Sequence, residues 1–275
     1  MLLSTEFVEE THFYHKVISL SLRLIRAHNR LYKCWMRLLW RLAGKAAPIV
    51  LMVHGFKPAT QDCKSAFEMT VSSFERLMRF LIKHGWEARR HETLLDFTSN
   101  RKSKCFYLTF DDVYDTVYSE AYPILKELDI PFTMFVTKDL VDKPGYITME
   151  HLLTLSQDPL CCVGAHGMTH SVFRDLSEKE VKEQCTGCRQ WLEQTLGVRV
   201  DTFAFPYGRI VEVSGRDRRI VKEAGFKIAF SALEGTVKSY WFTGRWFLPR
   251  VNVSEAFADR FTQGKRIRWK DCEGR

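Results

Sequence analysis

The chain has 275 residues, which suffices for one large α/β domain and is too short for two enzyme domains with linkers. Its net charge of +8 is carried by one segment, because residues 11–61 contain nine Lys and Arg residues and no Asp or Glu. The rest of the chain is nearly neutral, which argues against a nucleic-acid-binding protein, so no nucleic acid partner is expected.

The N-terminal segment has apolar residues at helical spacing with basic residues between them. We predict one long helix over residues 6–43, ended by Gly44 and Pro48. The sequence therefore divides into a basic amphipathic helical extension, residues 1–47, and a domain, residues 48–275.

Residues 14–45 combine two tryptophans with a basic face, which is typical of a helix lying on a membrane surface. Packing of the apolar stripe on the domain is an equal alternative, and a protein or oligomer interface is a third. The sequence contains neither a run of about 20 apolar residues, which a spanning helix needs, nor a visible secretion signal. We expect a cytoplasmic protein, peripheral on the inner face of the membrane.

After Pro48, apolar runs of β type alternate with helical patterns. The predicted strands are residues 49–54, 105–111, 131–137, 161–166, 202–206, 226–231 and 246–252. Capping boxes at Ser72 and Ser177 open two of the helices, and the second helix ends at Gly197. Strands separated by helices imply a parallel sheet. We predict an α/β fold: a distorted (β/α)7-type barrel with the N-terminal helical extension.

Eight cysteines are present, and without a secretion signal a reducing compartment is favoured over a disulfide framework. Cys185 and Cys188 form a C-x-x-C pair, the spacing of redox and zinc sites. They share an apolar helical stripe with Val181 and Leu192, however. Packing of these two thiols in the core is therefore the favoured interpretation.

Polar residues gather at the carboxyl ends of the predicted strands. His54 ends the first strand, Asp111 and Asp112 end the second, and His166 and His170 follow the fourth. In βα barrels the active site is assembled at this rim. These residues are therefore the candidates for chemistry.

The spacing of His166 and His170 would place both imidazoles on one face of a helical turn, ready for one metal ion. The Asp111–Asp112 pair supplies a third ligand and a spare carboxylate that can act as a base. Taken singly, an H-x-x-x-H pair is a weak signal, adjacent Asp residues are more often a turn or cap, and a lone His54 is more often a core residue. Their joint occurrence at strand ends favours a metal-dependent site.

From about Pro48 to Ser254 the chain resembles the polysaccharide deacetylase family, also called the NodB-homology family or carbohydrate esterase family 4. Residues 109–112 match its T-F-D-D motif, residues 166–170 its H-x-x-x-H motif, and residues 203–208 its motif ending in P-Y-G. The segment ending at His54 resembles that of the subgroup that deacetylates poly-N-acetylglucosamine, in which the strand order is permuted.

This resemblance implies that Asp112, His166 and His170 hold one divalent transition metal. Zn²⁺ is the favoured ion, and Co²⁺, Ni²⁺ and Mn²⁺ also suit such a ligand set. No other cofactor is expected.

The resemblance also implies the catalytic roles. Asp111 is implied as the general base, His54 as the general acid, and the backbone N–H of Tyr207 as part of the oxyanion hole. Arg250 lies in a segment similar to one in the subgroup, and we hypothesise that it orients Asp111.

Three positions depart from the family pattern. Val113 replaces a glycine, Gly167 replaces the usual Thr or Ser, and Val53 replaces a tyrosine. Because a β-branched residue disfavours positive φ, we expect the loop at Val113 to differ from that of the family. None of the three removes a predicted ligand or base.

The predicted function is that of a metal-dependent hydrolase that removes an acetyl or formyl group from the nitrogen of an amino sugar. The substrate would be a polysaccharide, an oligosaccharide or a lipid-linked saccharide. The alternatives are an O-acetyl esterase or a non-sugar amidase on the same fold, and an inactive carbohydrate-binding or membrane-tethered scaffold.

Overall fold

The computed structural model describes residues 48–57, 68–94, 104–237 and 243–265. The predicted extension 1–47 and its helix lie outside these residues and stay predictions. None of the helices in the described ranges is both long enough and apolar enough to cross a membrane.

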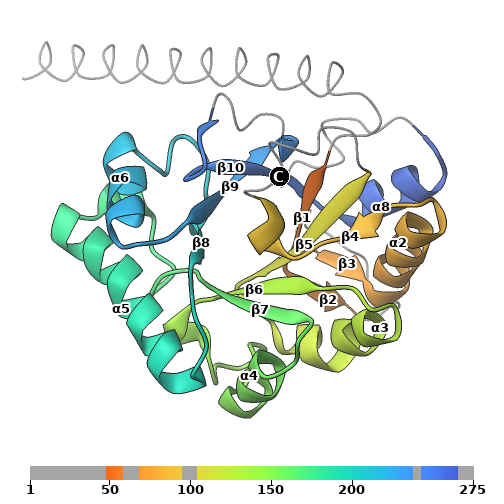
Figure 1. Cartoon of the computed structure of the whole chain (residues 1–275), viewed down its shortest axis with the longest axis horizontal. Helices are drawn as coiled ribbons and strands as arrows, with labels where there is room; N and C mark the ends of the chain where they lie inside the picture. The colour runs from red at the N-terminus through yellow and green to blue at the C-terminus, as the bar shows by residue number, and fades with distance from the viewer. Residues whose placement is uncertain (1–47, 58–67, 95–103, 238–242, 266–275) are drawn as a thin grey trace, which may run out of the picture. The chain divides into compact units, whose positions relative to one another are not determined.

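Seven parallel strands form a closed barrel (Figure 1). They are β1 (Ile49–Val53), β5 (Cys105–Asp111), β6 (Phe132–Val136), β7 (Cys161–Ala165), β8 (Thr202–Ala204), β9 (Ile228–Glu234) and β10 (Leu248–Asn252). Their order is β1-β10-β9-β8-β7-β6-β5, and β5 pairs back onto β1 along its length. This confirms the predicted distorted (β/α)7 barrel. All seven predicted strands are present; β9 is displaced most, beginning two residues later and ending three residues later than predicted.

Three short strands were not predicted. β4 (Glu87–Ala88) pairs with the first two residues of β5, before the residues of β5 that pair with β6. β2 (Gly55–Lys57) and β3 (Glu68–Thr70) form a separate parallel pair. Two or three residues are too few to show a strand period, so the sequence carries no signal for them.

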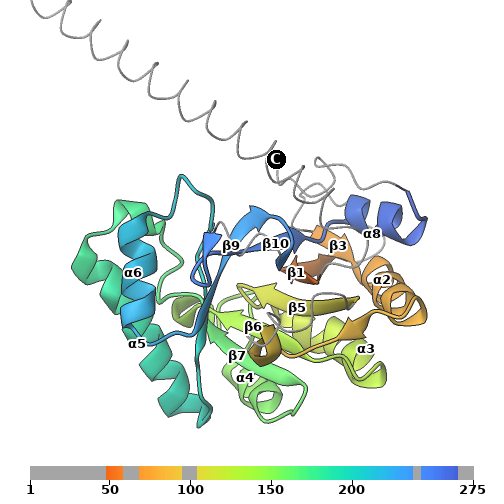
Figure 2. The same cartoon turned by 45° about the horizontal axis from the view of Figure 1, so that its top comes forward.

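The helices lie outside the ring of strands (Figures 1 and 2). They are α2 (Val71–Lys83), α3 (Tyr122–Glu127), α4 (Met149–Ser156), α5 (Glu178–Leu196), α6 (Gly215–Glu223) and α8 (Glu255–Thr262). Short η segments are the π-helical turn η2 (Val117–Ala121) and the 3₁₀ turns η3 (Lys138–Leu140) and η4 (Phe173–Asp175).

The helix boundaries test the two predicted caps. The capping box at Ser72 is wrong: α2 begins at Val71, and its cap is Thr70, whose side chain accepts the N–H of Ser73 at 3.2 Å. Thr70 can cap because its backbone is still extended. The capping box at Ser177 is confirmed, and Gly197 ends α5 with a φ of 67°.

The core is apolar and includes the C-x-x-C pair. Phenylalanines pack inside the barrel, with Phe135 and Phe230 at a ring-centroid distance of 5.5 Å. Cys185 and Cys188 are fully buried on α5 and form no disulfide. The prediction that these two thiols pack in the core is therefore confirmed.

Candidate active site

Three side chains that can bind a metal converge beyond the carboxyl ends of β5 and β7. Asp112 directly follows β5, His166 directly follows β7, and His170 lies four residues further on. Oδ1 of Asp112 lies 3.0 Å from Nε2 of His170 and 3.4 Å from Nε2 of His166. The structure thus brings the three predicted metal ligands together.

The spacing of these atoms fits a divalent metal. Oδ1 of Asp112 is buried and makes no hydrogen bond within the described residues, although two imidazole nitrogens lie beside it. Ligand atoms of a tetrahedral zinc ion lie about 3.4 Å apart, because its bonds to nitrogen and oxygen are about 2.1 Å long. A buried oxygen without a hydrogen bond, facing two nitrogens at such distances, suits a cation between them.

The protonation of the trio also suits a metal. Nδ1 of His166 lies 2.8 Å from the carbonyl oxygen of Ala204 and donates its proton there, which leaves the lone pair of Nε2 facing Asp112. Burial disfavours the charged form of Asp112, but the imidazoles of His166 and His170 outweigh it and hold the pKa of this carboxyl well below its usual range. Asp112 is therefore an anionic ligand.

A loop, not a helical turn, brings the two histidines together. Residues 166–172 form no helix, and His170 has a φ of 56°, so the predicted helical turn is wrong. Oε1 of Gln184, on α5, accepts the backbone N–H groups of Met168 and Thr169 at 2.7 and 3.0 Å. Sequence reasoning missed Gln184; the available signal was a buried polar residue beside the apolar stripe of α5.

Gly167 suits this loop for a backbone reason. Its φ is 88°, and a Cβ atom there would lie 3.1 Å from Oε1 of Gln184. Glycine adopts positive φ without steric cost. The glycine that departs from the family pattern at position 167 thus suits the positive φ that the loop has there.

Asp111 is held by a buried guanidinium. Nη1 and Nη2 of Arg250 donate to Oδ1 and Oδ2 of Asp111, each at 2.6 Å. Arg250 is itself held by the carbonyl oxygen of Ser231 at 2.9 Å and the hydroxyl of Thr109 at 3.2 Å. The hypothesised contact between Arg250 and Asp111 is present; sequence reasoning had not assigned Ser231 or Thr109.

The ion pair sets the charge of Asp111. Burial disfavours its charged form, but the Arg250 guanidinium outweighs burial and holds the pKa of the carboxyl below its usual range. Asp111 is therefore a carboxylate at neutral pH, and both of its oxygens have fixed positions.

His54 directly follows β1 and belongs to the same cluster. Burial lowers the pKa of His54, and the nearby carboxylates of Asp111 and Asp112 oppose this effect without overcoming it. Arg250 and His166 also act on its charge. The electrostatic neighbours of His54 are thus the other predicted site residues.

The backbone at Asp112 forms a tight turn with positive φ. Asp112 has a φ of 61°, and the N–H of Val113 donates to the carbonyl oxygen of Asp111 at 2.7 Å, which closes a γ-turn. Val113 has a φ of 49° and is fully buried. Although β-branched, Val113 thus takes a positive φ, as a glycine would; packing of its side chain offsets the strain.

Tyr207 lies at the centre of a second γ-turn. Its φ is 59°, and the N–H of Gly208 donates to the carbonyl oxygen of Pro206 at 2.6 Å. The N–H of Tyr207 makes no hydrogen bond within the described ranges, so it is available as a donor. Tyr207 is 51% exposed, and the centroid of its ring lies 4.8 Å from that of the His170 ring. The turn thus leaves the N–H free at a residue whose ring lies beside one of the metal ligands.

Comparison with known proteins agrees with this geometry. The polysaccharide deacetylase family model matches residues 98–229, which include Asp111, Asp112, His166, His170 and Tyr207. A poly-β-1,6-N-acetyl-D-glucosamine N-deacetylase of Staphylococcus aureus is 25% identical over 220 residues, which are 73% of this chain and 72% of the relative. Residues 98–229 thus belong to a polysaccharide deacetylase domain.

Solved structures share the fold. Streptococcus pyogenes deacetylase PplD, solved in complex with acetate, has a TM-score of 0.70 and 19% identity, covering 80% of this chain and 99% of that one. IcaB from Ammonifex degensii has a TM-score of 0.66 and 22% identity, covering 79% and 96%. The barrel described above is therefore the deacetylase fold of this family.

Proposed function

We propose that the protein is a metal-dependent deacylase that removes an acetyl group from the nitrogen of an amino sugar in a polysaccharide. One observation carries the proposal: Asp112, His166 and His170 converge next to Asp111, a second carboxylate that Arg250 keeps ionised and oriented. The name of the S. aureus relative supports an N-acetylglucosamine polymer as the substrate class. A formyl group on the same nitrogen would require the same chemistry.

The protein side chains would divide the work of hydrolysis. A metal at the trio supplies Lewis acidity toward the acyl carbonyl and makes a water more acidic. Asp111, a fixed carboxylate, accepts the proton of the attacking water, and His54 donates a proton to the departing amine. The N–H of Tyr207 donates a hydrogen bond to the carbonyl oxygen as negative charge develops on it.

We propose Zn²⁺ as the resident ion. Two imidazoles and one carboxylate are typical of catalytic zinc sites, which keep a position open for water or substrate. Co²⁺, Ni²⁺ and Mn²⁺ bind the same ligand types. Reconstitution of chelator-treated protein with each ion in turn, followed by activity and metal analysis, ranks them.

The test of function is acetate release from a β-1,6-linked N-acetylglucosamine oligosaccharide. The metal-loaded protein is expected to release acetate, chelated protein is not, and added metal restores release. His170→Ala is expected to lose metal and activity together, whereas Asp111→Asn keeps the metal and loses turnover. His84→Ala, an exposed histidine stacked on Phe80, is the matched control and changes neither.

Two outcomes would overturn the proposal. Release of acetate only from O-acetylated substrates would make the protein an esterase. Stoichiometric metal binding without hydrolysis of any acylated substrate would make it a binding scaffold.

We also propose that residues 14–45 contact an anionic membrane at its inner face, where a lipid-linked saccharide could be presented. Sequence composition supports this: each basic residue near such a surface contributes about 1 kcal/mol. The full chain is expected to co-sediment with anionic vesicles, and less so when Arg23, Arg26 and Arg30 are changed to Gln. Equal binding by this variant would contradict the proposal.

A further inference from the structure

A second group of metal-binding side chains lies at the opposite end of the strands. His91 and Glu92 occupy a short turn that follows β4, and Cys162 is the second residue of β7. Asp201 directly precedes β8. Because the strands are parallel, their amino ends form the floor of the barrel, away from the rim that carries the deacetylase site.

The potential ligand atoms are close together. One ligand atom each from His91, Glu92 and Cys162 lies within 4.8 Å of the others. Nδ1 of His91 is 3.7 Å from Oε2 of Glu92, and Sγ of Cys162 is 3.5 Å from Oε1 and 3.8 Å from Oε2 of that carboxylate. His91 and Cys162 are buried, whereas Glu92 reaches solvent, which leaves an entry path.

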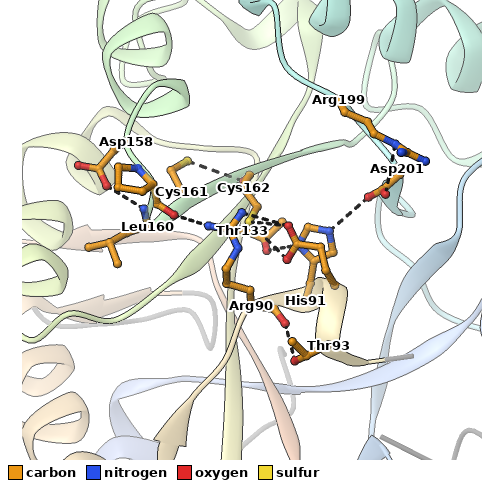
Figure 3. Close-up of polar contacts among 12 residues, drawn as sticks. Arg90, His91, Thr93, Thr133, Asp158, Leu160, Cys161, Cys162, Arg199 and Asp201 are labelled. Atoms are coloured by element: carbon orange, nitrogen blue, oxygen red, sulfur yellow. Dashed lines mark hydrogen bonds and ion pairs between the residues drawn. The ribbon is translucent and has the colours of Figure 1, made fainter. Parts of the chain in front are cut away.

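Outer partners orient two of these side chains. Oδ1 of Asp201 lies 3.4 Å from Nε2 of His91, and Oδ2 of Asp201 is paired with Lys227 at 2.9 Å (Figure 3 shows His91 and Asp201). A carboxylate at Nε2 holds the proton on that nitrogen, so Nδ1 carries the lone pair, which accepts a hydrogen bond from the hydroxyl of Thr133 while Oε2 of Glu92 lies 3.7 Å away. A histidine backed by a carboxylate on its far nitrogen is the arrangement that ligating histidines use.

Glu92 is oriented in the same way. Nη2 of Arg90 donates to Oε1 of Glu92 at 3.0 Å, which leaves Oε2 as the ligand atom. The hydroxyl of Thr133 lies 3.1 Å from Nδ1 of His91 and marks the inner wall of the group (Figure 3). Arg90 and Thr133 are thus polar partners of two of the three candidate ligands.

We propose that His91, Glu92 and Cys162 bind a zinc-class divalent ion at the floor of the barrel. Imidazole nitrogen, thiolate sulfur and carboxylate oxygen are the three ligand types that Zn²⁺ accepts, and a water completes a tetrahedron. On binding, the sulfur–metal bond replaces the S–H bond of Cys162, and the proton passes to solvent. The ion would join the turn after β4 to β7.

This second ion would act on stability. β4 has only two residues and, among the described residues, pairs only with the start of β5, so few backbone hydrogen bonds between described residues hold the turn that follows it. Residues at the floor of a βα barrel contribute to stability, whereas those at the rim contribute to chemistry. The site is independent of the deacetylase proposal, since it shares no ligand with Asp112, His166 and His170.

Loading metal-free full-length protein with Co²⁺ alone separates the two sites, because only a thiolate ligand gives a sulfur-to-cobalt charge-transfer band. Wild type is expected to bind a second equivalent and to show the band. His170→Ala is expected to lose the Co²⁺ equivalent bound at the rim of the barrel and to keep the charge-transfer band. Cys162→Ser and Glu92→Gln are each expected to lose the Co²⁺ equivalent bound at the floor and, with it, the charge-transfer band.

Cys161→Ser is the matched control, because Cys161 is the adjacent buried cysteine and lies outside the trio. It is expected to keep both the band and the second equivalent. Glu92→Gln covers the case in which Cys162→Ser fails to fold, since Glu92 is exposed. A single equivalent without a band in wild type, or a band that persists in Cys162→Ser, would overturn the proposal.

Discussion

Arg250 binds both carboxylate oxygens of Asp111 inside the barrel, where the two residues are 1% and 3% exposed. Such a bidentate ion pair fixes the plane of the carboxylate as well as its position. The guanidinium in turn is fixed by Ser231 and lies 5.7 Å from the ring of Phe135. The orientation of the proposed base is therefore set by the packing of the barrel interior.

Arg250→Lys is expected to lower kcat about 100-fold with little change in KM, since an ammonium keeps the charge and loses the fork that orients Asp111. Metal content should stay at the wild-type level, because Arg250 touches no member of the trio. Arg219 forms a surface ion pair with Glu178, and Arg219→Lys is the control, which should leave kcat, KM and metal content unchanged. Loss of metal together with activity would mean that Arg250 only holds the fold.

The roles of His54 and Asp111 can be separated by the leaving group. An amine must be protonated as it departs, whereas an activated aryl oxide departs without a proton. His54→Ala is therefore expected to reduce hydrolysis of an N-acetyl sugar by about 100- to 10,000-fold and that of an aryl acetate far less. Asp111→Asn should impair both, since both need an activated water. If His54→Ala lowered the rate of hydrolysis of both substrates equally, His54 would not be the general acid.

The barrel and the ligand set could be predicted because both depend on local pattern. Seven apolar runs showed the strands, and polar residues at their carboxyl ends showed the rim. The loop from His166 to His170 was mistaken for a helical turn, since the residue that holds it, Gln184, comes from α5 and acts only through the tertiary fold. The spacing of residues in the sequence does not reveal such a contact.

The backbone torsion angles of the site are a second feature that the sequence does not predict. Asp112, Val113 and Tyr207 all have positive φ, which residue preferences disfavour. Val113 shows this most clearly: its β-branched side chain predicted a different loop, yet its full burial keeps the turn.

Asp158 gives a pH-dependent stability that lies outside both sites. Burial disfavours its charge, but the hydroxyl of Tyr122, which donates to Oδ2 at 2.5 Å, and the N–H of Leu160 outweigh burial and hold the pKa of Asp158 below its usual range. A depressed pKa stabilises the fold above the unfolded value, about 3.9, and the effect is lost as pH falls through the folded pKa.

Asp158→Asn is therefore expected to lower the free energy of unfolding by about 1 kcal/mol at neutral pH, the net worth of one such hydrogen bond. The gap between variant and wild type should narrow as the pH falls below the unfolded value of about 3.9 and through the lower folded pKa of Asp158. Urea unfolding at several pH values measures it. A gap of constant size would show that the ionisation of Asp158 plays no part.

Tyr207 offers a test of whether its backbone or its ring acts. Because its φ is 59°, glycine can occupy the position with the same turn and the same N–H. Tyr207→Gly is expected to keep the metal and to retain activity within about 10-fold of the wild type, because the variant keeps the backbone N–H. Removing an oxyanion donor would cost about 100- to 1000-fold. Tyr207→Pro, which lacks the N–H and cannot adopt this φ, should lose the larger factor. If the activity of Tyr207→Gly falls as far as that of Tyr207→Pro while the metal is kept, the ring that lies beside His170 is the group that matters.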